Sequence, residues 1–193
     1  MMKPAKERVV LECAAREEWD AWLDANHDSA SEIWLRFAKK GADATTVSRA
    51  DALEAALCWG WIDGQAASQD DRFWLQRFTP RRKRSKWSRI NREAAELLIA
   101  SGKMMPPGLA AVEAAKADGR WDAAYAPPSR IEIPADLAGR LEADPAAKAF
   151  FESLSSQNRY AILYRIAEAK RPETRTRRIE KFMGMLARGE TIH

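Results

Sequence analysis

Four short runs in the first half of the chain have the apolar content or the period-two alternation of β-strands. They are residues 9–12, 32–39, 61–68 and 72–79. The last two runs flank a polar centre at residues 68–71, which predicts a β-hairpin. We expect the four runs to form a small antiparallel sheet.

Other segments have apolar residues at the three- and four-residue spacing of amphipathic helices. Before Tyr125 they are residues 16–27, 48–60, 88–102 and 107–119. Ser48 and Asp51 have the spacing of a capping box, and Ser88 is a candidate cap for the third helix. The face of that third helix expected to be buried consists of Ile90, Ala94, Leu97 and Leu98.

The composition changes after Tyr125. Three prolines follow within ten residues, which predicts an extended linker at residues 126–134. Beyond it the pattern is helical, and Pro145 and Pro172 each suit the first turn of a helix. The clearest apolar stripe, which is typical of a helix packed into a core, consists of Ile179, Phe182, Met183 and Leu186.

Together these elements predict an α+β protein in which a small antiparallel sheet is covered by helices and followed by a helical module. We expect an α+β domain at residues 1–125, the linker at 126–134 and the helical module at 135–193. The start of the chain has no apolar run of signal-peptide length, and no window approaches the roughly 18 apolar residues of a membrane span. We therefore expect a cytoplasmic protein that does not contact the membrane.

Cysteine and histidine are scarce in this chain of 193 residues, which has two of each. A zinc site or a Ser/His/Asp triad would depend on His27 or on the terminal His193. We expect no metal, no cofactor and no catalytic residues. An enzyme that uses Asp63 as a general base is a further alternative, supported only by a single carboxylate with no identified partner.

Positive charge is concentrated in residues 77–93, RFTPRRKRSKWSRINRE, although the whole chain has a formal net charge of only +4. The cations of this stretch are Arg77, Arg81, Arg82, Lys83, Arg84, Lys86, Arg89 and Arg92. The stretch joins the predicted hairpin to the start of a predicted helix. Antiparallel pairing within the hairpin is expected to bring Trp61 and Asp63 near Arg77 and Thr79.

We predict a ligand or partner site where the hairpin meets the basic stretch. Guanidinium groups bind phosphate or carboxylate, free N–H groups at a helix start add donors, and indole faces exclude water. The serines and the asparagine would offer hydrogen bonds or cap the helix. The predicted site residues are Trp61, Asp63, Arg77, Thr79, Arg81, Ser85, Trp87, Ser88 and Asn91. The expected ligand is an anionic small molecule or a protein partner.

The same residues also have purely structural interpretations. Trp59 and Trp61 suit a hydrophobic core, because tryptophan is highly buried on average. Asp63 would then serve only as the ion-pair partner of Arg77 or Arg81.

A nucleic-acid-binding loop at residues 77–92 is the main functional alternative. Interleaved cations and aromatic rings follow a phosphate backbone and stack on bases. However, no helix-turn-helix, zinc-finger or RNP pattern accompanies them. The centre of the stretch, residues 82–84, is most simply a solvated loop tip.

Four segments before Tyr125 resemble, in the same order, the bacterial YdeI/OmpD-associated family, whose members are also called bacteriocin-protection proteins. The segments are SEIWLRFAKKG, ADALEAALCWGWIDGQ, RFTPRRKRSKWSRIN and SGKMMPPGLAAVEAAKADGRW. The later segment RYAILYRIAEAKRPETRTRRIEKFMGMLARG is similar to the helical module that ends those proteins, so the resemblance spans residues 19–189. It implies a role in stress or bacteriocin tolerance. It identifies no catalytic residues.

Overall fold

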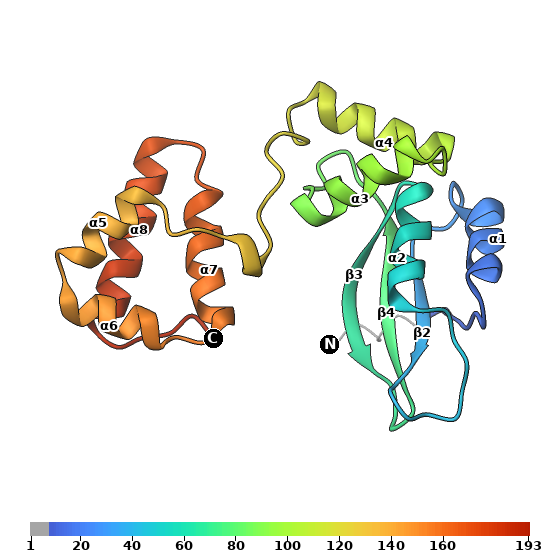
Figure 1. Cartoon of the computed structure of the whole chain (residues 1–193), viewed down its shortest axis with the longest axis horizontal. Helices are drawn as coiled ribbons and strands as arrows, with labels where there is room; N and C mark the ends of the chain where they lie inside the picture. Colours follow the sequence, from blue (N-terminus) through green and yellow to red (C-terminus); the bar gives the residue numbers. More distant parts are fainter. Residues whose placement is uncertain (1–7) are drawn as a thin grey trace, which may run out of the picture. The chain divides into compact units, whose positions relative to one another are not determined.

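The computed structural model of the chain describes residues 8–193 and has an α+β fold (Figure 1). The predicted fold class is thereby confirmed. One unit ends at Ala124 and a second begins at Tyr125. The first contains the sheet and its helices, and the second is helical. Among residues 8–193, no helix has both the length and the apolar character needed to cross a membrane.

The sheet described in the first unit has four strands. They are β1 (Val10–Leu11), β2 (Ile33–Ala38), β3 (Trp61–Ser68) and β4 (Phe73–Pro80). Their order across the sheet is β1-β2-β4-β3. β4 pairs antiparallel with both β2 and β3, as predicted, whereas β1 pairs parallel with β2. The prediction of a wholly antiparallel sheet is therefore wrong at β1.

The helix between β1 and β2 explains the parallel pair. This helix, α1, covers Arg16–Asn26. A chain that leaves one strand, passes through a helix and returns beside that strand can run in its original direction, whereas a tight hairpin reverses it. Residue alternation locates a strand but carries no information about its direction.

Three further helices lie in the described part of the first unit, residues 8–124. They are α2 (Arg49–Cys58), α3 (Arg89–Ala100) and α4 (Pro106–Ala117). Figure 1 shows α2 lying along the sheet with α1 beside it. The predicted cap of α2 is confirmed, because Ser48 Oγ accepts a hydrogen bond from the Asp51 N–H at 3.1 Å. The Asp51 carboxylate accepts in return from the Ser48 hydroxyl, at 2.6 Å, rather than from its backbone N–H.

Aromatic rings from α1 and the sheet form the centre of this unit. The ring centroids of Trp19 and Phe78 lie 5.4 Å apart, and those of Trp22 and Trp61 lie 5.6 Å apart in an edge-to-face contact. Trp19, Phe78 and Trp61 are at most 1% exposed. Because the buried face of α2 consists largely of alanines, the helix leaves room for these large rings.

The start of α4 packs closely on the end of α2. A Cβ atom added to Gly108 would lie 2.1 Å from the Cys58 carbonyl oxygen, so only glycine fits there. Gly60, which has a φ of +73°, approaches Pro107 in the same way. The Cys58 oxygen also accepts a hydrogen bond from the Met105 N–H at 3.1 Å. These contacts fix where α4 begins.

The buried face of α3 differs from the predicted one. Leu98 is buried as expected, but Leu97 is 72% exposed and Ile90 is 49% exposed. The inward face instead consists of Asn91, Ala95 and Leu98. A polar residue on the inner face shifts the stripe by one position, and the hydrophobic pattern alone does not reveal this shift.

The second unit has a short 3₁₀ turn and four helices within its described residues. They are the turn η1 (Pro128–Arg130) and the helices α5 (Ala135–Glu142), α6 (Pro145–Ser153), α7 (Ser156–Ala167) and α8 (Pro172–Ala187). Pro145 and Pro172 each occupy the first turn of their helix, as predicted. The predicted stripe on α8 is confirmed as core, with Ile179, Phe182, Met183 and Leu186 all buried.

Candidate functional site

The two predicted tryptophans lie in the core rather than in a ligand-facing wall. Trp61 and Trp87 are each 1% exposed. The Trp61 Nε1–H donates to the His27 carbonyl oxygen at 3.1 Å. Trp87 packs against Trp121, with ring centroids 4.8 Å apart. Trp59, which is 8% exposed, is also a core residue and packs against the His27 ring.

Asp63 and Arg77 pair with residues outside the predicted set. The Asp63 carboxylate accepts from Arg49 Nη2 at 2.8 Å, at the start of α2. Arg77 forms an ion pair with Glu32, which directly precedes β2. The suggested pairing of Asp63 with Arg77 or Arg81 is therefore corrected.

The register of the hairpin gives the physical reason. Asp63 is opposite Phe78, and Trp61 is opposite Pro80. Successive side chains of a strand point to opposite faces, so Arg77 and Thr79 face the other side of the sheet from Trp61 and Asp63. The four predicted residues of the hairpin are close along the ladder but do not converge on one pocket.

A second group of predicted residues does come together, in residues 81–89, called the basic loop below. The Arg81 guanidinium carbon lies 3.5 Å from the centroid of the Trp87 ring, which is cation–π geometry. The same side chain donates from Nη1 to the Lys86 carbonyl oxygen at 3.3 Å. Ser85 Oγ accepts from the Arg82 N–H at 2.9 Å and closes a tight turn.

Arg120 braces the basic loop from the segment after α4. Its Nη1 donates to the Ser85 carbonyl oxygen at 2.8 Å. The Nε of the same guanidinium group lies 2.8 Å from both carboxylate oxygens of Asp118. Trp121, the next residue, packs on Trp87. The loop is thus held by an ion pair, a carbonyl contact and an aromatic pair rather than by its own backbone alone.

The end of the basic loop is the N-terminus of α3. Ser88 is its cap, because Ser88 Oγ accepts from the Asn91 N–H at 3.1 Å. The Asn91 side chain is 8% exposed and lies on the inner face of the helix. The first turn of α3 has no acidic residue. No acidic side chain of the first turn therefore offsets the partial positive charge at this end of the helix.

The exposed side chains of the basic loop include five cations: Arg82, Lys83, Arg84, Lys86 and Arg89. Of these, Arg82, Lys83, Arg84 and Arg89 form no ion pair within the part of the chain that the structure describes. A loop held by the contacts of Arg81, Ser85 and Trp87 therefore presents unpaired positive charges beside a helix N-terminus. Such an arrangement suits an anionic partner.

Sequence reasoning missed the residues that hold this loop. Arg120 and Trp121 lie more than thirty residues after the loop and form no motif with it. Arg49 lies 14 residues before Asp63, and Glu32 lies 45 residues before Arg77, so neither pair forms a local motif. The sequence around Arg120 and Trp121, DGRW at residues 118–121, carries no signal of these partners.

The two cysteines are poor candidates for nucleophiles. Burial raises the pKa of the Cys13 thiol to about 11, and burial also raises the pKa of Cys58. Both thiols are consequently protonated at neutral pH, and the thiolate is the reactive form. Residues 8–193 contain no cluster of three or more His, Cys, Asp or Glu side chains suited to a metal ion.

Comparison with protein families gives two matches that together cover most of the chain. Residues 11–111 match the family described as a domain of unknown function (DUF8412). Residues 130–189 match the family described as "Bacteriocin-protection, YdeI or OmpD-Associated". The resemblance inferred from sequence is confirmed by the second match, whereas most of the N-terminal segments that suggested it fall within the first. Neither the curated proteins nor the solved structures gave a significant match.

Proposed function

We propose that this chain binds an anionic ligand or partner through its basic loop. The chain belongs to the DUF8412 family over residues 11–111 and carries a YdeI/OmpD-associated module at residues 130–189. It would act without catalysis, in the cytoplasm, as part of stress or bacteriocin tolerance. The description of the second family supports the biological role.

The observation that carries the proposal is the group of unpaired cations on a braced loop. Ordering a flexible loop on binding costs about 0.5–1.5 kcal/mol for each immobilised side chain. Here the Arg81–Trp87 stack and the Arg120 contact with Ser85 hold the backbone before any ligand arrives. In this proposal the predicted residues Arg81, Ser85, Trp87, Ser88 and Asn91 form the frame. The exposed cations touch the ligand.

A ligand screen tests the proposal directly. Phosphorylated and carboxylated metabolites, nucleotides and peptidoglycan precursors would be added to the full chain, and melting would be followed by tryptophan fluorescence. A compound at about 100 times its Kd stabilises the folded state by about 2.7 kcal/mol, which is easily detected. We expect at least one anionic class to raise the melting temperature.

Matched variants link any hit to the basic loop. The test variant combines Arg82→Gln, Lys83→Gln and Arg84→Gln. The control variant combines Arg140→Gln, Arg165→Gln and Arg177→Gln, which removes the same charge from exposed positions of the second unit. The stabilisation should disappear in the test variant and persist in the control. Equal stabilisation of both variants, or no hit at all, refutes the proposal.

Nucleic acid is the second candidate, and the four unpaired cations of the loop favour it. Binding to a duplex through four phosphates should weaken with salt, with a slope of about −3.6 in log K against log salt, or about −2.8 for a single strand. A single small anion should show a much shallower slope. If mixed DNA and RNA fail to bind at low salt, this candidate is abandoned while the ligand screen still stands.

The biological role has its own test. A strain that lacks the protein would be complemented with the parent, the loop variant or the control variant, and survival would be scored after bacteriocin exposure. We expect the parent and the control to restore survival and the loop variant to fail. Equal survival of the deletion strain and the parent strain would contradict the role in bacteriocin tolerance.

A further inference from the structure

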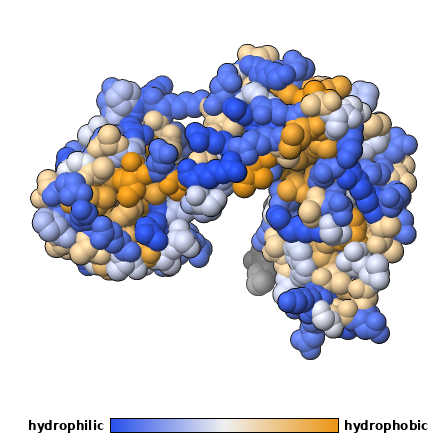
Figure 2. Space-filling model, viewed as in Figure 1, coloured by the Kyte–Doolittle hydropathy of each residue, from blue (hydrophilic) through white to orange (hydrophobic). Residues whose placement is uncertain are grey.

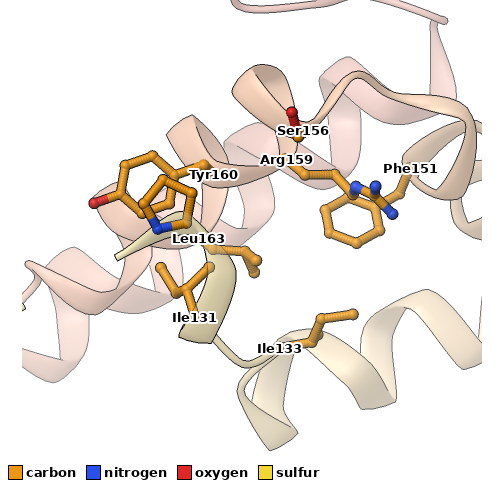
Figure 3. A pocket seen from close by; sticks show the side chains of 8 residues that line it. Ile131, Ile133, Phe151, Ser156, Arg159, Tyr160 and Leu163 are labelled. Carbon is orange, nitrogen blue, oxygen red and sulfur yellow. The ribbon is translucent and has the colours of Figure 1, made fainter. Parts of the chain in front are cut away.

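The second unit contains a pocket with a volume of about 240 Å³ (Figure 3). Its walls are mostly apolar and include Ile131, Ile133, Phe151 and Leu163. Ser156, Arg159 and Tyr160 are the lining residues with polar side-chain groups. Figure 2 shows that hydrophobic surface is exposed on this unit and bordered by hydrophilic surface.

Contacts within the second unit hold the pocket open. The Tyr160 hydroxyl donates to the Ala126 carbonyl oxygen at 3.2 Å, which ties the segment before η1 to α7. Burial raises the pKa of Tyr160 to about 12, so the hydroxyl keeps its proton and continues to donate at neutral pH. The rings of Tyr125 and Tyr164 add an edge-to-face contact at 5.3 Å. The pocket is therefore formed before a ligand arrives.

The polar groups of the pocket lie at the N-terminus of α7. Ser156 is the first residue of this helix, and Arg159 follows one turn later. Arg159 and Phe151 both line the pocket, and Figure 3 shows their side chains. Within residues 8–193 the Arg159 guanidinium makes no hydrogen bond or ion pair. An unpaired cation and a helix N-terminus thus meet at the border of an apolar pocket.

The volume limits the size of a ligand. A cavity of about 150 Å³ holds benzene, which corresponds to about 25 Å³ for each non-hydrogen atom. A pocket of about 240 Å³ therefore accommodates about ten non-hydrogen atoms. Octanoate, with eight carbons and two oxygens, has this size.

We propose that this pocket binds a small amphipathic carboxylate. The apolar chain of the ligand packs on Ile131, Ile133 and Leu163, and its carboxylate pairs with the Arg159 guanidinium. Charge complementarity favours an anion over a neutral or cationic ligand of the same shape. This site is independent of the basic loop, because every residue that lines it belongs to the second unit.

A series of straight-chain carboxylates tests the proposal. Butanoate, hexanoate, octanoate and decanoate would be titrated into the full chain at pH 7, each below its micelle concentration. We expect affinity to rise about two- to fourfold for each added methylene up to octanoate and then to level off. The Kd of octanoate should be on the order of 1 mM. Methyl NMR signals of Ile131, Ile133 and Leu163 should shift during the titration.

Two variants and two matched controls locate the site. Arg159→Gln should weaken octanoate binding about fivefold, because the ion pair is partly exposed. Ile133→Ser should weaken it to a similar degree by removing part of the wall. The controls Arg177→Gln and Ile90→Ser change an exposed arginine and an exposed isoleucine elsewhere. Both controls should bind octanoate like the parent.

Three outcomes would overturn the proposal. The first is the absence of octanoate binding at 10 mM, about ten times the expected Kd. The second is equal affinity for 1-octanol and octanoate, together with unchanged octanoate binding by the Arg159→Gln variant. These two results would show that charge plays no part in binding. The third is a titration in which the methyl signals of Ile131, Ile133 and Leu163 do not shift, while those of Ile90 and Leu97 do. The basic-loop variant should bind octanoate normally, so a failure of this proposal leaves the proposed function untouched.

Discussion

Replacing Gly108 by alanine should strongly destabilise the first unit. The added Cβ would lie 2.1 Å from the Cys58 carbonyl oxygen and 2.8 Å from its carbonyl carbon. Both atoms belong to the backbone at the end of α2, so they cannot move aside by a rotamer change. Only a displacement of α4 relieves the clash.

The magnitude follows from the size of that displacement. The Cβ–oxygen separation must rise from 2.1 Å to about 3.4 Å, the lower limit of an ordinary contact. A shift of about 1.3 Å breaks the 3.1 Å hydrogen bond from the Met105 N–H to the Cys58 oxygen. Overpacking costs about 1–3 kcal/mol and the lost hydrogen bond about 1 kcal/mol. We therefore expect a loss of about 3 kcal/mol.

The matched control is the same substitution at Gly139, in the interior of α5. No heavy atom lies within 4 Å of a Cβ added at that position. Alanine should therefore stabilise the helix by about 0.5–1 kcal/mol, because it restricts the unfolded chain and favours helical backbone. The two substitutions have opposite predicted signs for purely structural reasons.

Aromatic composition separates the two effects in one assay. All eight tryptophans lie in the first unit and all three tyrosines in the second. Urea unfolding followed by tryptophan fluorescence thus reports the unit that contains Gly108. With a slope of about 1.5 kcal/mol per molar urea, Gly108→Ala should lower the midpoint by about 2 M. Gly139→Ala should leave this midpoint unchanged. In the same titration followed by circular dichroism, it should move the loss of helical signal to a higher urea concentration.

The result that would refute this reasoning is specific. If Gly108→Ala unfolds within 0.3 M urea of the parent, the close packing of α4 on α2 is wrong. The same displacement should also loosen the basic loop, since Arg120 and Trp121 follow α4 and brace it. Faster amide exchange at Ser85 in the variant would show this link.

Three further predictions concern caps, charges and thiols. Ser88→Ala removes the cap of α3 and should cost the first unit about 1 kcal/mol, measured by urea unfolding. Arg175 holds the pKa of the Asp136 carboxyl below its ordinary value of 3.8. The pair should therefore stabilise the second unit above about pH 4, by less than about 1 kcal/mol, and lose this effect as the pH falls through the lowered pKa; Asp136→Asn should abolish this pH dependence in thermal melts. Cys13 and Cys58 are buried and should react with a thiol reagent only on unfolding; rapid reaction of the native protein at pH 8 would contradict their burial and raised pKa.

The local elements of this fold were largely predictable. The hairpin, the caps at Ser48 and Ser88, and the proline starts of α6 and α8 all depend on residues a few positions apart. Such short-range preferences hold because backbone geometry and capping hydrogen bonds are local. The α8 stripe was predictable for the same reason.

The candidate site was only partly predictable. The sequence placed Trp61, Asp63, Arg77 and Thr79 near one another, but not on which sheet face each side chain lies. A shift of one residue in the strand register exchanges the two faces. Nor did the sequence indicate that Arg49 and Glu32 would engage Asp63 and Arg77.

The sequence by itself determined the α+β class, the positions of most elements and the concentration of positive charge before α3. Tertiary structure alone decided the parallel direction of β1, the inner face of α3 and the burial of Trp87. The solvent exposure of residues 82–84 was predicted, but only the structure shows that Arg81 stacks on Trp87 and belongs to the frame of the loop. The physical reason is that these properties depend on contacts between residues far apart in the chain, such as Arg120 with Ser85. Local propensity carries no information about those contacts.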